Sequence, residues 1–354
     1  MRFAYMPDTH FGVYDQEVPG PEEVAAGWDQ ILLEAETAER VGFDGIFLPE
    51  RHARTETYTP NTMQVATAIA ARTSRVTIAT TVMMPPLHNP MKLAEEIAMV
   101  DNLAKGRFVF GAGVGYHEGY HQMLGVPFRR RGKRFEEAME VITKALTGER
   151  FSFHGEFFDY EDVALSPIGY QRPRPPIWIG AHTPGKPVDR ALDYDGWVLW
   201  TQPDWDEAEP WIKEMRERAA AAGRTDWVVV LDQDGWIGDD AAAVRERHSP
   251  RWLREATFYG EHDFPAEIDP KSDTSQAQGA EEALLDFETR QMHFGTPESW
   301  VERIGELERR LAPDWLNIRT RGPKAEYGPE YPTLEESIEC IERFGNEVIS
   351  KFSR

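Results

Sequence analysis

The chain alternates between short apolar runs and longer segments with helical periodicity. Val76–Val82 is rich in β-branched residues, which is typical of a buried strand. The next segment carries Leu93, Ile97, Val100 and Leu103 at three- and four-residue spacing and predicts a helix with one buried face. The same reading predicts strands at 2–6, 45–48, 76–82, 107–111, 177–180, 195–200, 227–237 and 315–319. It predicts helices at 21–41, 63–72, 90–105, 128–146, 183–194, 210–222, 239–248, 297–311 and 333–352.

This order of strands and helices predicts a (β/α)8 TIM barrel that forms one domain over residues 1–354. Residues 151–165 alternate in polarity around Gly155 and predict a hairpin outside the barrel. A mobile insertion is expected at about 255–285. Its part from Tyr259 to Gly279 is rich in Asp, Pro, Ser and Gln, and is a candidate lid over the site.

Glycines follow the strand at 107–111, in the run Gly111-Ala112-Gly113-Val114-Gly115. Glycine lets a ligand approach the backbone closely, and parallel α/β folds bind ligands at the carboxyl ends of their strands. A dinucleotide fingerprint would need a helix that begins inside the motif, and here the sequence continues as Tyr116-His117-Glu118. A tight turn without a ligand remains the alternative.

Two further strand ends carry candidate chemistry. Gly180-Ala181-His182-Thr183 precedes a predicted helix, so its backbone N–H groups, the Thr183 hydroxyl and Lys186 are a candidate phosphate site. A capped helix that binds nothing is the alternative. His52 follows the strand at 45–48 and is the leading acid/base candidate, because histidine titrates near neutrality.

Composition and charge limit which classes of partner the protein can bind. The chain has 61 acidic and 39 basic residues and a formal net charge of -22, which disfavours nucleic acid and anionic membranes as partners. Cys340 is the single cysteine and is expected to be a packing residue. The sequence shows no signal-peptide pattern and no run of about 20 apolar residues, which predicts a cytoplasmic protein.

Neither a metal site nor a common hydrolase is expected from the motifs. His117, Glu118 and His121 have the spacing of the H-E-x-x-H zinc motif, but Gly115 and Gly119 disfavour the regular helix that this motif needs, so no metal is expected. G-x-S-x-G and P-loop sequences are missing, which disfavours the commonest hydrolases and nucleoside triphosphatases.

Four stretches together resemble the bacterial luciferase-like family of flavin-dependent monooxygenases. They are FDGIFLPERH, NPMKLAEEIAMVDNLAKGRFVFGAGVGY, LGVPFRRRGKRFEEAMEVI and RPRPPIWIGAHTPGKPVDRALDYDGW. The resemblance runs from about residue 2 to 200 and returns at 316–348. It implies a flavin site at the carboxyl ends of the barrel strands.

The resemblance also assigns roles to residues. In the family, the segment matching Gly180–Thr183 holds the flavin phosphate, and a strand-end bulge, often with a cis peptide, lies against the flavin ring. That bulge is expected at Ala79-Thr80. Members commonly read E-H-H where this chain has Glu50-Arg51-His52, so the histidine that is catalytic in luciferases is Arg51 here and light emission is not expected. The expected cofactor-binding residues are Ala79, Thr80, Thr81, Gly113, Val114, Gly115, Gly180, Ala181, His182, Thr183 and Lys186. The expected substrate contacts are His10, His117 and Arg319, with His52 catalytic.

The function implied is a monooxygenase that uses O2 and reduced FMN, supplied by a separate reductase, on a small organic substrate. Hydride transfer with the deazaflavin F420 is the first alternative, for which the basic residues 129–134 would suit an acidic cofactor tail. A non-catalytic flavin-binding subunit is the second. The resemblance also implies a homodimer or homotetramer, paired through helices that carry Trp28, Leu32, Met63 and Val65.

Overall fold

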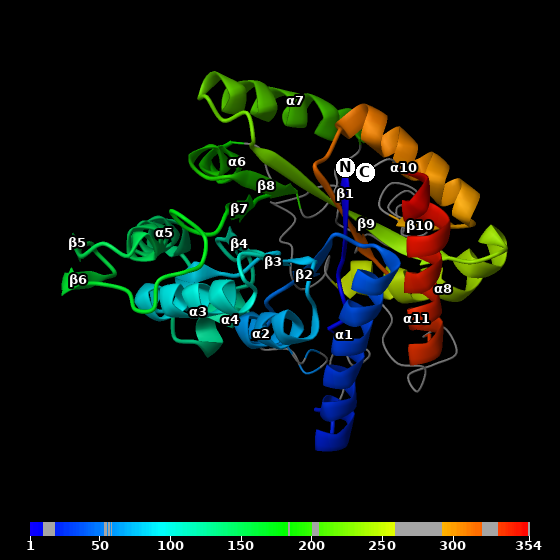
Figure 1. The fold of residues 1–354 in the computed structure, drawn as a ribbon, viewed down its shortest axis with the longest axis horizontal. Coiled ribbons are helices and arrows are strands. Elements are labelled where there is room, and N and C mark those ends of the chain that lie inside the picture. Colours follow the sequence, from blue (N-terminus) through cyan, green and yellow to red (C-terminus); the bar gives the residue numbers. More distant parts are fainter. Residues whose placement is uncertain are drawn as a thin grey trace.

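The structure is a computed structural model that describes residues 1–9, 18–52, 55, 57, 59–182, 185–199, 205–258, 292–320 and 332–352. Within these residues, eight parallel strands close into a barrel surrounded by helices (Figure 1). The ring closes because β8 and β11 both pair with β9. The barrel strands are β1 (Arg2–Tyr5), β2 (Gly45–Leu48), β3 (Thr77–Thr80), β4 (Phe108–Gly113), β7 (Ile177–Gly180), β8 (Gly196–Leu199), β9 (Val228–Ile237) and β11 (Trp315–Arg319). The predicted (β/α)8 fold is therefore confirmed.

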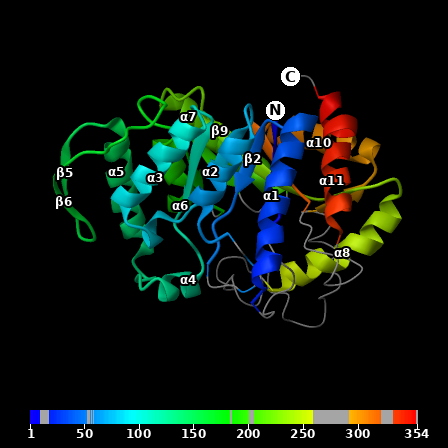
Figure 2. The same cartoon turned by 60° about the horizontal axis from the view of Figure 1, so that its bottom comes forward.

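Helices cover the outside of the barrel. They are α1 (Pro21–Val41), α2 (Thr62–Arg72), α3 (Pro90–Leu103), α4 (Glu118–Met123), α5 (Arg131–Thr147), α6 (Lys186–Asp189), α7 (Trp205–Ala221), α8 (Ala241–Phe258), α10 (Pro297–Leu311) and α11 (Leu334–Arg343). Short 3-10 turns η1 (Pro85–Leu87), η2 (Arg190–Asp193) and η6 (Ile349–Lys351) and a π-turn, η5 (Phe344–Val348), join or extend them. The first and last helices, α1 and α11, lie side by side (Figure 2), and an ion pair of 2.7 Å joins Arg40 to Glu342.

Local signals in the sequence set the helix boundaries. The Asn89 side chain accepts a hydrogen bond of 3.1 Å from the Lys92 N–H, and Pro90 is the first residue of α3. Thr333 and Glu336 form a complete capping box at the start of α11. These caps satisfy backbone donors that the first turn of a helix leaves without partners.

Apolar side chains fill both layers of the fold. Inside the barrel, Ala79 packs with large rings, and the Phe47 ring lies 5.7 Å from Trp178 and 5.3 Å from Trp315. Between strands and helices, a larger cluster takes in the buried faces of the surrounding helices, including Leu93 and Ile97 of α3. Polar side chains also lie within the barrel strands, where Nδ2 of Asn317 donates to Oδ1 of Asp232 at 2.8 Å.

Several elements differ from the prediction. Helix α6 is four residues long and passes into η2, whereas a helix over 183–194 was expected. Helix α7 begins at Trp205, so Pro210 lies inside the helix and is not its first residue. The short strand β10 (Met292–Gly295), which pairs with the second half of β9, was not predicted.

The hairpin outside the barrel is confirmed. Strands β5 (Phe151–His154) and β6 (Asp159–Val163) pair antiparallel and project beyond α5 (Figure 1). Of the insertion expected at 255–285, residues 255–258 belong to α8, which runs ten residues past its predicted end. The remainder, including the candidate lid, lies outside the described residues.

Candidate active site at the carboxyl ends of the strands

The chain forms a bulge directly after β3. Strand β3 keeps its register with β2 up to the pair Leu48 and Thr80. Just after this pair, the peptide bond between Thr81 and Val82 is cis. The chain then rejoins β4, where Met83 pairs with Ala112. The bulge was expected at Ala79-Thr80, and that position is wrong because regular pairing with β2 continues through Thr80.

The glycines around the bulge make room for protein atoms. A Cβ added at Gly113 would lie 2.6 Å from Cγ2 of Val82, and one added at Gly180 would lie 2.8 Å from its Cγ1. A Cβ at Gly111 would lie 1.9 Å from the Thr80 carbonyl oxygen. Glycine is therefore required here by the packing of the bulge. Ligand contact by Gly113 and Gly180 stays a prediction.

The three candidates at the end of β3 have different surroundings. Ala79 packs inside the barrel. The Thr80 hydroxyl donates to the Gly111 carbonyl oxygen at 2.8 Å and accepts from the Gly111 N–H at 2.8 Å. Thr81 Oγ1 is also buried but has no hydrogen-bond partner within the described part of the chain.

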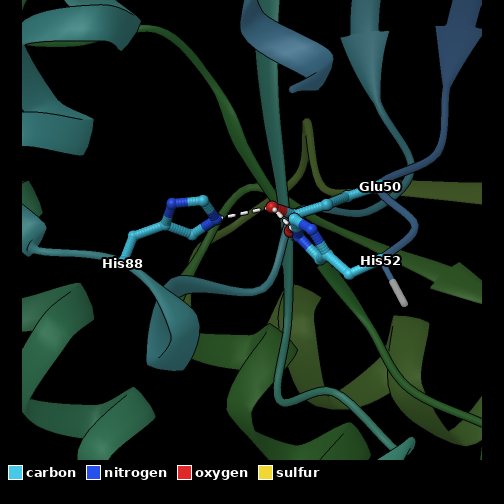
Figure 3. Close-up of side chains that lie close together, drawn as sticks. All are labelled: Glu50, His52 and His88. Atoms are coloured by element: carbon cyan, nitrogen blue, oxygen red, sulfur yellow. Dashed lines mark hydrogen bonds and ion pairs between the residues drawn. The ribbon is translucent and has the colours of Figure 1, made fainter. Parts of the chain in front are cut away.

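Glu50, His52 and His88 form a cluster beside this bulge (Figure 3). Glu50 Oε1 lies 3.1 Å from Nε2 of His52 and 2.5 Å from Nε2 of His88. Glu50 Oε2 accepts a hydrogen bond of 2.5 Å from the N–H of Met84, just beyond the bulge. Burial acts to raise the pKa of Glu50, but the hydrogen bonds from His52 and His88 outweigh it and lower the pKa to about 2. Glu50 is therefore a carboxylate at neutral pH.

Glu50 and His88 were not among the predicted site residues. Glu50 stands two positions before His52, and His88 follows η1, at the same end of the barrel. In the sequence, only their positions after the ends of strands could have pointed to Glu50 and His88 as site residues. The contact between them spans 38 residues of sequence, which periodicity does not reveal.

Beyond β4, the glycine segment meets α4 and α5. Gly115 has φ 82°, which favours glycine, and its carbonyl oxygen accepts a hydrogen bond of 2.9 Å from Nε of Arg131. Val114 is half-buried next to it. The His117 ring stacks on Tyr120 with the ring centres 4.4 Å apart.

His121 points into the protein. It is fully buried, and neither ring nitrogen has a hydrogen-bond partner among the described residues. Burial, followed by the charges of Arg131 and Arg134, lowers its pKa to about 4. The imidazole is therefore neutral at physiological pH.

Part of the predicted phosphate site is already bonded to protein. The Ala181 N–H donates to the Val198 carbonyl oxygen at 3.2 Å, and Nζ of Lys186 lies 3.0 Å from a Glu136 oxygen. His182 is half-buried, and Thr183 lies outside the described residues. Helix α6 has four residues and continues directly as η2, and phosphate binding by this segment stays a prediction.

Arg319, an expected substrate contact, is held by two carboxylates. Its guanidinium bonds to both oxygens of Asp234 and lies 3.4 Å from Oδ2 of Asp232, and all three residues are buried. His10, the remaining expected contact, lies outside the described residues.

Among the described helices, none is long and apolar enough to cross a membrane.

The protein-family model described as luciferase-like monooxygenase matches residues 7–313. The oxygenase component of the flavin-dependent trigonelline monooxygenase of Acinetobacter baylyi is 31% identical over 159 residues, 44% of this chain and 44% of that protein. The F420-dependent glucose-6-phosphate dehydrogenase of Kineococcus radiotolerans is 32% identical over 202 residues, 53% of this chain and 58% of that protein. The match thus spans about half the length of each of these relatives.

A solved structure supports the fold. The oxygenating constituent of 3,6-diketocamphane monooxygenase from Pseudomonas putida, in complex with FMN, superposes with a TM-score of 0.74 and 18% identity, and covers 100% of this chain and 99% of that one. The family match over residues 7–313 and the closed barrel confirm the resemblance found in the sequence: this chain belongs to the luciferase-like monooxygenase family of oxidoreductases.

Proposed function

We propose that this protein is the oxygenase component of a flavin-dependent monooxygenase, which uses O2 and reduced FMN from a separate reductase on a small organic substrate. The observation that carries the proposal is the Thr81 hydroxyl, which is buried and has no partner among the described residues. It lies after β3, while His52 follows the neighbouring strand β2. An oxygenase component among the relatives supports the separate reductase.

The residues at this strand end suit a flavin. A buried hydroxyl without a hydrogen bond costs about 1–3 kcal/mol, and a polar atom of a bound ring would remove that cost. Thr81 would therefore bond to the flavin, and the neighbouring bulge offers a wall of backbone and small side chains. When bound, reduced FMN supplies the electrons for the reaction with O2. His52 would hold and transfer a proton at one of its ring nitrogens.

A pair of matched variants tests the site. Thr81→Val keeps the shape of the side chain and removes the unpartnered hydroxyl, so we expect reduced FMN to bind about 5- to 150-fold more weakly, equivalent to about 1–3 kcal/mol. Thr80→Val is the control, because its hydroxyl serves the Gly111 backbone. It should lower protein stability, whereas Thr81→Val should not. Unchanged affinity of Thr81→Val for reduced FMN would contradict the proposed flavin position.

F420 is the competing cofactor, because one relative is named as F420-dependent. An acidic cofactor tail needs free cationic charge, but Arg130 and Lys133 both pair with Glu156. Arg131 is turned toward the Gly115 carbonyl oxygen. Because these contacts occupy part of the basic cluster, they favour FMN over F420 as the cofactor. Parallel titrations with reduced FMN, oxidised FMN and F420 decide between the cofactors, and tighter binding of F420 would overturn this choice.

We further propose that the protein forms a homodimer. Of the four residues on the expected pairing helices, Met63 and Val65 are buried in the core, and Trp28 and Leu32 are half-buried. Exposed apolar side chains occur on the neighbouring helices α1 and α3, namely Leu33, Met99 and Leu103. Sedimentation should give a species of twice the 40.4 kDa chain mass. A species of the chain mass alone at micromolar concentration would contradict the dimer.

A further inference from the structure

The Glu50 carboxylate is shared by two histidine rings (Figure 3). Both Nε2 atoms approach the same oxygen, Oε1, at 3.1 Å for His52 and 2.5 Å for His88. The Glu50 side chain is fully buried and that of His52 is 8% exposed, whereas that of His88 is 25% exposed. The cluster thus reaches from a buried histidine to one that water can touch.

The shared carboxylate determines where the histidine protons lie. An ionised carboxylate accepts hydrogen bonds and donates none, so both rings must carry a hydrogen on Nε2. A neutral imidazole has one N–H, and its other nitrogen is then a bare acceptor. In neutral His52, this nitrogen is Nδ1.

Further contacts fix the cluster in place. Oε2 of Glu50 accepts from the Met84 N–H, and the Tyr120 ring packs edge-on against His52 with the ring centres 5.7 Å apart. The chain before His88 is held by Arg134, whose Nε donates to the Pro86 carbonyl oxygen at 2.8 Å. The rings are therefore oriented before a ligand binds.

We propose that Glu50 and His88 are positioning residues for His52, which they hold in the Nε2–H tautomer so that Nδ1 is the atom that takes or releases the proton. When Nδ1 takes a proton from a ligand, the ring becomes an imidazolium and the Glu50 carboxylate balances its charge. The role of Nδ1 in turnover rests on the proposed monooxygenase function, but the tautomer does not.

The two positioning residues have opposite electrostatic effects. The Glu50 carboxylate can balance the charge of an imidazolium at His52, whereas His88 bonds to the same oxygen and draws on that charge. The groups that face His88 are Glu50 and, from α3, Glu96. Burial acts to lower the pKa of His88, but these two carboxylates outweigh burial and raise the pKa. Replacing Glu50 and replacing His88 should therefore move the protonation of His52 in opposite directions.

A divalent metal ion is the alternative occupant, since the three ligand atoms lie within 4.8 Å of one another. Two ligands on one zinc ion, with bonds of about 2.0 Å, are about 3.3 Å apart. The separation of 2.5 Å between Glu50 Oε1 and His88 Nε2 is shorter than that and fits a charge-assisted hydrogen bond. The geometry therefore favours hydrogen bonds over a metal.

Nitrogen-15 NMR of histidine-labelled protein reads the tautomer directly and needs no substrate. The chain has ten histidines, and the His52 signals are those lost in His52→Asn. We expect the neutral ring of wild-type His52 to carry hydrogen on Nε2 and none on Nδ1, and Glu50→Gln to give a mixture of tautomers. The control, His154→Gln, removes an exposed histidine of the hairpin and should leave the His52 signals unchanged. A wild-type His52 protonated on Nδ1, or already a mixture, would overturn the proposal.

Reoxidation of reduced FMN by O2, followed against pH, tests the effect on proton transfer. Glu50→Gln should move the low-pH limb of the rate profile to lower pH, because a neutral amide no longer balances the charge of the imidazolium, and His88→Leu should move it to higher pH. A role limited to folding would lower the rates without moving the limb. The proposal fails if the low-pH limb stays in place in both variants. It also fails if a chelator abolishes the activity and Zn²⁺ restores it. Reoxidation that does not differ from that of free reduced FMN would refute the monooxygenase function and leave the NMR result standing.

Discussion

A buried carboxyl group outside the proposed site, Glu34, gives a sharp test of the electrostatic reasoning. It lies on α1 and is 1% exposed. Gln30 donates to its Oε1 at 2.8 Å, and the Tyr5 hydroxyl and the Asp8 N–H approach Oε2 at 3.2 and 3.3 Å. Burial raises its pKa from 4.5 to about 8, against the opposing effect of the Gln30 hydrogen bond. The folded protein therefore keeps Glu34 protonated at neutral pH.

The sign of the effect follows from linkage. Below pH 4.5 the carboxyl is protonated in both states and costs nothing. As the pH rises from 4.5 to about 8, the unfolded chain ionises and the folded protein does not, so the free energy of unfolding falls. At about 1.4 kcal/mol per pKa unit, the loss is about 3 kcal/mol at pH 7 and about 5 kcal/mol above pH 8.

Glu34→Gln removes this loss without changing the shape of the side chain. Gln30 can turn its amide to offer oxygen in place of nitrogen, so the new amide keeps a partner. We expect the free energy of unfolding to rise by about 1–3 kcal/mol at pH 8, after part of the gain is spent on burying the amide, and to fall by about 1–3 kcal/mol near pH 4.5, where nothing offsets the cost of burying the amide.

Thermal and urea unfolding at pH 4.5, 6, 7 and 8.5 would measure the trend. Glu36→Gln, on the same helix, is the control. It removes an exposed ion pair with Arg72 and should change stability by at most about 1 kcal/mol, with no trend between pH 6 and 8.5. If Glu34→Gln destabilises the protein equally at pH 5 and pH 8, the buried group is ionised and the reasoning is wrong.

Two further variants probe histidines of the site. His52→Asn should leave flavin affinity unchanged and reduce turnover about 10²- to 10⁴-fold, the usual contribution of a general acid or base, as measured by equilibrium binding and steady-state rates. Loss of flavin affinity with normal turnover of the bound enzyme would make His52 a cofactor ligand instead. His121→Leu removes two buried ring nitrogens without partners and should stabilise the protein by about 1–3 kcal/mol. Because burial lowers the pKa of His121 to about 4, protonation of the unfolded chain costs stability as the pH falls below about 6.5, so the gain in urea unfolding should be larger at pH 5 than at pH 8. A loss at both pH values would mean that the imidazole has a partner.

Most of the barrel could be predicted because each of its elements carries a local pattern. The strand after Val76 and the helix capped by Asn89 are examples, since β-branched residues and a capping side chain act within a few positions. Strand β10 was missed because its sequence, Met-His-Phe-Gly, is short and lacks such a pattern. The short α6 was missed because Gly185, with φ 99°, breaks the segment in a way that needs the backbone to be seen.

The site was harder to predict because its contacts are long-range. Thr81 was expected as part of the flavin wall and His52 from its place after a strand end, and both roles stay predictions. Glu50 was in view in the same motif, but its function depends on His88, which the chain brings close only on folding. Sequence reasoning also explained the glycines by a ligand, whereas the structure explains Gly113 by the Val82 side chain. A glycine pattern shows that something approaches the backbone, and cannot show what it is.

The same carboxylate links the bulge to the histidines. Glu50 Oε2 bonds to the N–H of Met84, beyond the bulge, while Oε1 bonds to His52 and His88. The bulge in turn is fixed where Val82 packs against Gly113 and Gly180. A shift of the bulge would therefore move Glu50 and, with it, the ring of His52. The position of the proposed flavin wall and the orientation of the proposed acid/base are thus set by one connected group of contacts, so substitutions in the bulge should alter proton transfer as well as cofactor binding.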